Sequence, residues 1–137
     1  MGLVVPDIGE LYILASWILG YAPTNLKVHL YQNNYTPVDS TVLGDLTEAT
    51  FSGYAAAAVT LGTPTEVSNK AKTVGTAAQV FTHNGGGTAN TIYGYYVKDL
   101  STGNLAWVER FGSSQIMTNN GDQISITIQL TCDSENH

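Results

Sequence analysis

The sequence predicts a mainly β domain, either jelly-roll-like or a β-sandwich of about seven or eight short strands, with one N-terminal α-helix. Three features of the chain lead to this fold class. Apolar residues alternate with polar ones in several segments, turn-forming residues separate those segments, and an apolar period typical of a helix occurs before Gly20. The length of 137 residues fits a single domain, which we expect to span residues 1–137.

The helix is expected within residues 7–20, with its body from Ile8 to Leu19. Asp7 and Glu10 have the spacing of a capping box, in which side-chain oxygens accept hydrogen bonds from free backbone N–H groups at the helix start. Gly20 suits the left-handed position that commonly ends a helix. The sequence therefore predicts both ends of this helix from local signals.

The β-sandwich is expected over residues 25–132, followed by a short tail over residues 133–137. In the first strand, apolar side chains occupy one face and Lys27, His29 and Tyr31 occupy the other, as in a half-buried strand. The last strand alternates in the same way, with isoleucines from Ile124 onward on one face. The expected strands are LKVHLY (26–31), AQVFTH (78–83), NTIYGYYVKD (90–99), NLAWVERF (104–111) and QISITIQLTC (123–132). Turns are expected at NGGG (84–87), STGN (101–104) and NNGD (119–122).

The four alanines from Ala55 to Ala58 favour a helix by intrinsic propensity alone. However, Phe51, Gly53 and Tyr54 interrupt a helical period, and the strand-forming run Val59–Leu61 follows. Strands are also expected on both sides of this segment. We therefore predict that the alanines belong to a strand at a tightly packed point of the fold.

Composition and charge exclude several kinds of partner. Five basic against eleven acidic residues give a net charge of −6, which argues against a nucleic-acid-binding surface. The apolar stretch between Glu10 and Gly20 is much shorter than the ~20 residues needed to span a bilayer, so we expect no membrane partner. The single cysteine cannot form an internal disulfide.

No enzyme class is indicated by the residues that could carry chemistry. Asp45 and Glu48 are close in the sequence, but we expect them in a solvated loop and not across a substrate cleft. His29, His83 and His137 are scattered and are expected on the surface, without the spacing of a metal site. The sequence therefore predicts no catalytic residues, no metal and no cofactor.

Three blocks of the sequence resemble small virion proteins encoded in the structural gene clusters of tailed phages, and in particular capsid decoration, or cement, proteins. The blocks are LTEATFSGYAAAAV, NTIYGYYVKDLSTGNLAWVERF and NNGDQISITIQLT, which together cover about Leu46 to Thr131. The resemblance also includes the N-terminal helix and the LKVHLYQNN segment before the Thr36-Pro37 turn.

The resemblance implies a protein that binds the outer surface of an assembled head through the major capsid protein and stabilises it by adhesion. It also implies a homo-oligomer, with a trimer favoured, that is made in the host cytoplasm and ends on the outside of the virion. A tail or fibre component of the virion, which would recognise host-surface glycans, remains as an alternative. An enzyme such as a glycan hydrolase is a third and much weaker alternative.

Partner surfaces are expected where apolar side chains have no evident cover. In the strand Asn90–Asp99, the alternation places Ile92 and Tyr96 on one face and three apolar residues on the other, so one face would meet a sister subunit. The helix places Tyr12, Ile13 and Trp17 opposite a stripe made by Leu11, Leu14, Ala15 and Ile18, and the arm over residues 1–6 has no evident partner. The predicted interface residues are Leu3, Val4, Val5, Tyr12, Ile13, Trp17, Tyr93, Tyr95 and Val97. We expect the segment from Gly2 to Leu19 to be the main capsid-docking or subunit-locking element. The alternative is that the helix only closes the open end of the sandwich and is buried within its own subunit.

Overall fold

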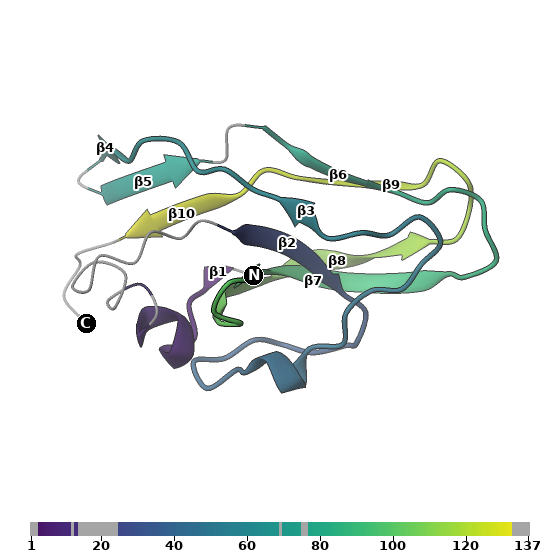
Figure 1. The fold of residues 1–137 in the computed structure, drawn as a ribbon, viewed down its shortest axis with the longest axis horizontal. Coiled ribbons are helices and arrows are strands. Elements are labelled where there is room, and N and C mark those ends of the chain that lie inside the picture. Colours follow the sequence, from purple (N-terminus) through teal and green to yellow (C-terminus); the bar gives the residue numbers. More distant parts are fainter. Residues whose placement is uncertain (1–2, 12, 14–24, 69, 75–76, 133–137) are drawn as a thin grey trace.

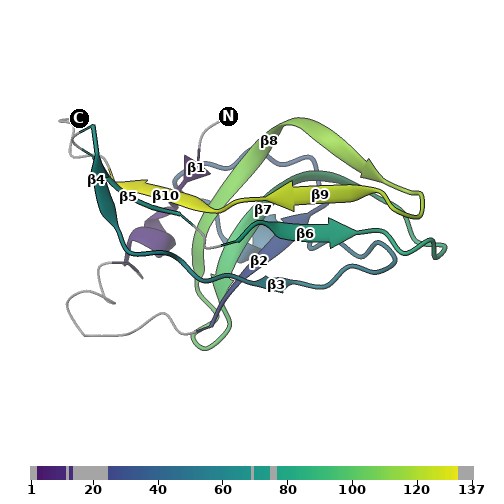
Figure 2. The ribbon, with the colours of Figure 1, turned by 90° about the horizontal axis from the view of Figure 1, so that it is seen from above.

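Antiparallel strands in two facing layers form the fold, with a short helix at its N-terminal side (Figures 1 and 2). The computed structural model describes residues 3–11, 13, 25–68, 70–74 and 77–132. One layer is a five-stranded sheet in the order β1 (Leu3–Val4), β8 (Leu105–Met117), β7 (Asn90–Asp99), β2 (Leu26–Tyr31) and β3 (Ala57–Ala58). The other contains the pair β6 (Gln79–Thr82) and β9 (Gln123–Ile126) beside the three strands β10 (Gln129–Cys132), β5 (Lys70–Val74) and β4 (Thr65–Val67). The predicted β-sandwich class is confirmed.

Two of the predicted strands have the expected bounds, whereas the strand expected over residues 104–111 extends to Met117 as β8. β2 and β7 have the bounds expected from the sequence. The expected strand over residues 123–132 is divided, because its first half pairs with β6 and its second half with β5. The hairpin of β4 and β5 was not predicted, so the described residues hold the ten strands β1 to β10 instead of seven or eight.

The alanine segment is extended, as predicted, but the strand within it is short. β3 contains only Ala57 and Ala58, which pair with Val28 and Lys27 of β2 at the edge of the large sheet. Val59 follows directly and is buried in the core.

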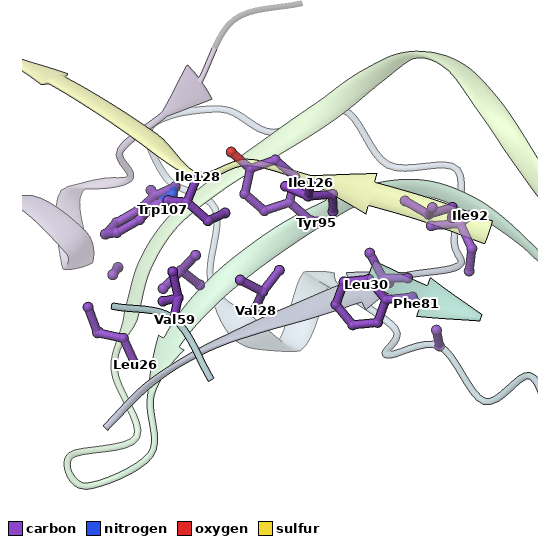
Figure 3. Packing of buried hydrophobic residues seen from close by; sticks show 14 of the residues in the cluster. Leu26, Val28, Leu30, Val59, Phe81, Ile92, Tyr95, Trp107, Ile126 and Ile128 are labelled. Atoms are coloured by element: carbon purple, nitrogen blue, oxygen red, sulfur yellow. The ribbon is translucent and has the colours of Figure 1, made fainter. Parts of the chain in front are cut away.

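The main hydrophobic core lies between the two layers (Figure 3). Its members come from the inward faces of the strands, and the alternation Ile124, Ile126, Ile128 predicted for the last strand is buried as expected. Other buried members include Leu26, Val28, Leu30, Phe51, Phe81, Ile92, Tyr95, Val97, Trp107 and Met117.

A second hydrophobic cluster covers the outer face of the large sheet, and this cover was missed by the sequence analysis. Its buried members are Tyr31, Leu46, Tyr96, Leu105 and Val108, with Val4, Tyr35, Leu43 and Tyr93 packed around them. The segment after β2 crosses this face before the chain returns to β3 (Figure 1). The second face of β2, predicted to be polar and exposed, is therefore buried, with His29 only 6% exposed.

The alternation of β7 changes at Tyr93, which corrects the predicted faces of this strand. Ile92 lies in the main core with Tyr95, whereas Tyr93 packs beside Tyr96 in the second cluster. The change coincides with an irregular register, because Ile92 pairs with Gln115 while Gly94 pairs with Arg110. The extra residues on β8 form a bulge, and a bulge shifts which residues face the core.

The N-terminal helix begins at Asp7 and packs on β8 by its glycine. The Glu10 N–H donates to the Pro6 carbonyl over 2.9 Å, so Asp7 lies within the first turn and is not the predicted cap. A Cβ on Gly9 would overlap the carbonyl oxygen of Ala106, which shows how closely the two backbones approach.

Two described residues of the helix, Leu11 and Ile13, lie on the opposite sides from those predicted. Leu11 is 66% exposed, whereas Ile13 is half-buried against the main core. Pro6, Gly9 and Ile13 follow one another at helical spacing, and this face turns inward because Gly9 allows the closest approach. The predicted end of the helix and the tail 133–137 lie outside the described residues.

Candidate functional site

The apolar arm has a structural partner within the same chain. Leu3 and Val4 form β1 and pair with Glu109 and Val108 at the edge of β8. Leu3 and Val5 pack against the main core, and Val4 packs against the second cluster. All three side chains are half-buried, so the arm adds a strand to its own sheet and leaves part of its surface accessible.

The interface prediction for β7 is corrected by its burial. Tyr95 is 4% exposed and Val97 is 0% exposed, so both belong to the core of the subunit and offer no surface to a partner. Tyr93 is half-buried, and its ring faces the Arg110 guanidinium at 5.3 Å. Tyr12 and Trp17 of the predicted interface lie outside the described residues.

A hydrogen-bonded cluster centred on Glu48 joins the block LTEATFSGY to β2. The Tyr54 hydroxyl donates to Glu48 Oε1 over 2.9 Å, and His29 Nδ1 donates to the same oxygen over 2.7 Å. Tyr54 in turn accepts a hydrogen bond from the Leu30 N–H. The His29 ring stacks on Tyr96 with centroids 4.9 Å apart. The Glu48 carboxylate thus fastens the loop to the outer face of the large sheet.

The Tyr54 hydroxyl is held in its protonated form. Burial raises its pKa, and the nearby Glu48 carboxylate raises that pKa further. Burial also raises the pKa of Tyr96. Tyr54 therefore acts as a stable hydrogen-bond donor to Glu48.

Asp45 has a separate role from Glu48. Its Oδ2 atom accepts hydrogen bonds from the Val42 N–H over 2.9 Å and from the Tyr35 hydroxyl over 3.3 Å. These bonds fix the short 3₁₀ turn η1 (Leu43–Asp45). The two carboxylates predicted in one solvated loop each stabilise a different part of it.

His83 is fully buried, which corrects its predicted place on the surface. Its Nδ1 atom accepts a hydrogen bond from the Gly85 N–H over 3.0 Å, and its Nε2 atom donates to the Thr88 carbonyl over 2.9 Å. The ring therefore ties together both ends of the glycine-rich turn. Phe51 stacks beside it at 6.0 Å. A histidine next to a glycine-rich turn carries no local sequence signal for such burial.

The described part of the chain contains neither a metal-binding cluster nor a membrane-spanning helix. Within residues 3–11, 13, 25–68, 70–74 and 77–132, no group of three or more His, Cys, Asp or Glu side chains could hold a metal ion. In the same ranges, no helix has the length and apolar character needed to cross a membrane.

A polar groove of about 460 Å³ runs between β8 and β9 on an open side of the sandwich. Side chains that line it include Phe111, Gln115, Gln123 and Ser125. A second hollow of about 490 Å³ lies toward β1 and β10, and Glu109 lines both. Burial raises the pKa of Glu109. No sequence pattern predicts this groove, because it depends on how the edges of the two layers meet.

Arg110 contributes to the wall of the groove, but its guanidinium is engaged elsewhere. It donates to the Tyr35 carbonyl over 2.7 Å and to Asn34 Oδ1 over 2.6 Å. The positive charge therefore anchors the segment after β2 to the large sheet.

Comparison with known proteins identifies no family, because no protein-family model and no curated protein matches the chain. The resemblance of the three sequence blocks to virion proteins therefore stands on those residues alone.

Proposed function

We propose that the chain is a virion structural protein, most specifically a capsid decoration protein that binds the outer surface of the head and stabilises it by protein–protein contacts. One observation carries this proposal: the three blocks that resemble decoration proteins meet in a single structural unit. Phe51 of the first block, Tyr95 of the second and Ile124 of the third share the main core. The resemblance therefore concerns residues that build the same fold.

The polar residues of these blocks support an adhesive role over a chemical one. Glu48 bonds His29 and Tyr54, and Asp122 bonds the backbone of its own turn. Because these polar side chains are bonded within the subunit, contacts with a partner fall to the exposed surface. A protein that binds an assembled shell but not its free subunits stabilises the shell by mass action.

Binding to purified heads tests the proposal. Heads of the encoding phage, prepared without this protein, would be titrated with the purified chain, and the bound copies would be counted by quantitative gel analysis and cryo-EM. We expect saturation at hundreds of copies on the outer surface and a higher temperature of head disruption. Attachment of a few copies at the tail alone would contradict the decoration role.

The groove between β8 and β9 favours a second candidate, a tail or fibre component that recognises host-surface glycans. Its volume of about 460 Å³ lies within the range of small-molecule sites, and Gln115, Gln123 and Ser125 could bond sugar hydroxyls. The test is binding to an array of bacterial surface glycans by the native chain and by Q123A. Binding that is lost in Q123A would support the glycan role, and a uniformly negative array would leave the decoration role preferred.

A further inference from the structure

Four of the exposed large apolar residues lie on two adjoining segments, the start of the helix and the loop before η1. Leu11 is 66% exposed, Val38 51%, Val42 49% and Ile8 40%. The Asp7 N–H donates to the Asp39 carbonyl over 2.8 Å, which joins the two segments (Figure 1). We call these four residues the helix–loop patch. Exposed apolar residues that gather on neighbouring segments mark interaction sites more often than scattered ones do.

In this loop a polar side chain is buried and two apolar side chains are exposed, which is the reverse of the usual arrangement. Thr41 is 1% exposed, whereas the valines on either side of it are about half exposed. Thr41 Oγ1 accepts a hydrogen bond from the Val38 N–H over 2.8 Å and lies 3.1 Å from the Tyr35 hydroxyl. The Val42 N–H is bonded to Asp45. The outward position of both valines is therefore fixed before any partner binds, which lowers the entropy cost of binding.

Three acidic side chains lie on the same two segments as the patch. Asp7, Glu10 and Asp39 are exposed on the same two segments. The basic residues of the chain are Lys27, Lys70, Lys72, Lys98 and Arg110. Of these, Arg110 has its guanidinium bonded to Asn34 and Tyr35, ahead of the loop. A surface that complements the patch must therefore be apolar at its centre and carry Lys or Arg at its rim.

We propose that the helix–loop patch is the docking surface for the capsid shell, through an apolar site on the shell that is rimmed by basic residues. This inference rests on the decoration role proposed above. A second copy of the chain is a poorer occupant, because symmetric pairing of the patch would place the acidic side chains of one copy against those of the other.

A pair of double variants with equally exposed residues tests the patch. L11S/V38S removes two of its apolar side chains. The control I116S/V80S removes side chains that are 68% and 52% exposed, on β8 and β6. The probe is purified heads prepared without this protein. We expect L11S/V38S to bind roughly tenfold more weakly or worse, with the control within about twofold of the native chain.

Charge variants test the rim independently. E10Q/D39N removes two negative charges beside the patch while keeping the size of the side chains. E66Q removes one negative charge from β4 as a control. We expect E10Q/D39N to associate with heads more slowly and to show a weaker dependence of binding on salt, while E66Q behaves as the native chain does.

The outcomes separate this inference from the proposed function. If the native chain does not bind heads, both are overturned. If the native chain binds and L11S/V38S binds equally well while remaining folded by circular dichroism, the patch is overturned and the decoration role stands. If L11S/V38S loses only self-association in sedimentation, the occupant is a second copy and the inference is wrong.

Discussion

Asp122 organises the turn between β8 and β9 with a single carboxylate oxygen. Its Oδ2 atom accepts hydrogen bonds from the Thr118 N–H over 2.9 Å and from the Asn119 N–H over 2.7 Å. These bonds lower the pKa of Asp122 below its ordinary value of 3.8. Because the pKa is lower in the folded state, the carboxylate stabilises the fold above its ordinary pKa, and this contribution is lost as pH falls through the lowered pKa.

Substitution D122N should therefore destabilise the protein at neutral pH and have a smaller effect in acid. The measurement is urea unfolding of the native chain and D122N at several pH values between about 7 and 2. We expect the difference in midpoint to shrink below the ordinary pKa of the carboxyl group. E66Q serves as the control for loss of one negative charge, and an equal loss in E66Q would contradict the specific role of Asp122.

Two histidines show which property of single residues could not be predicted from the sequence. The histidines at positions 29 and 83 were predicted on the surface, yet they are 6% and 0% exposed. The cover over each one comes from segments distant in the chain, such as Glu48 for His29 and Phe51 for His83. The pattern of residues along a strand predicts its alternation, but it does not predict which distant segment packs on the second face of the strand.

At the scale of elements, the contact of Gly9 with β8 predicts an effect opposite to helix propensity. Alanine in place of glycine ordinarily stabilises a helix by about 1 kcal/mol. Here a Cβ would meet the Ala106 carbonyl, so G9A should destabilise the protein by about 1–3 kcal/mol.

The control for G9A is G112A on β8, the strand that Gly9 contacts. A Cβ at Gly112 would have no atom within 4 Å, so its unfolding midpoint in urea should stay close to that of the native chain. A midpoint that rises in G9A would mean that the helix is not held against β8.

Two strands were predicted with the correct bounds, whereas the capping box at Asp7 and Glu10, an equally local signal, was wrong. The bounds of β2 and β7 follow from residue type and period, and the alternation of Ile124, Ile126 and Ile128 fixed the buried face of the last strand. The bulge in β8 opposite Tyr93 was not predicted, because register depends on the neighbouring strand. The inward face of the helix was also missed, since closeness of approach at Gly9 decided it and not hydrophobicity.

For the whole molecule, the homotrimer expected from the resemblance stays a prediction. Sedimentation at micromolar concentration and near-neutral pH should give three times the mass of one chain, since closed symmetry is usual for homo-oligomers. The contact cannot use Tyr95 or Val97, which are buried within the subunit. A strictly monomeric mass under these conditions would contradict the trimer.

The sandwich class could be predicted from the sequence, but most of the candidate surface could not. Leu11 was expected in the core and Val38 was not singled out, although both are exposed on the helix–loop patch. Leu11 is exposed because the Gly9 face of the helix packs on β8, and Val38 is exposed beside the buried Thr41. Contacts between distant segments produce no periodic pattern in the sequence, so they could not be predicted from it.

The short outer strands of the large sheet have a consequence for aggregation. β1 and β3 each contain two residues, so the sheet ends on both sides with little unpaired backbone in a straight row. Beyond β1, the bulge in β8 interrupts the remaining edge. Edge-to-edge growth into fibrils needs a long, flat row of free N–H and C=O groups. The large sheet therefore offers few free backbone groups at which further strands could add to form a fibril, even at high local concentrations of the chain.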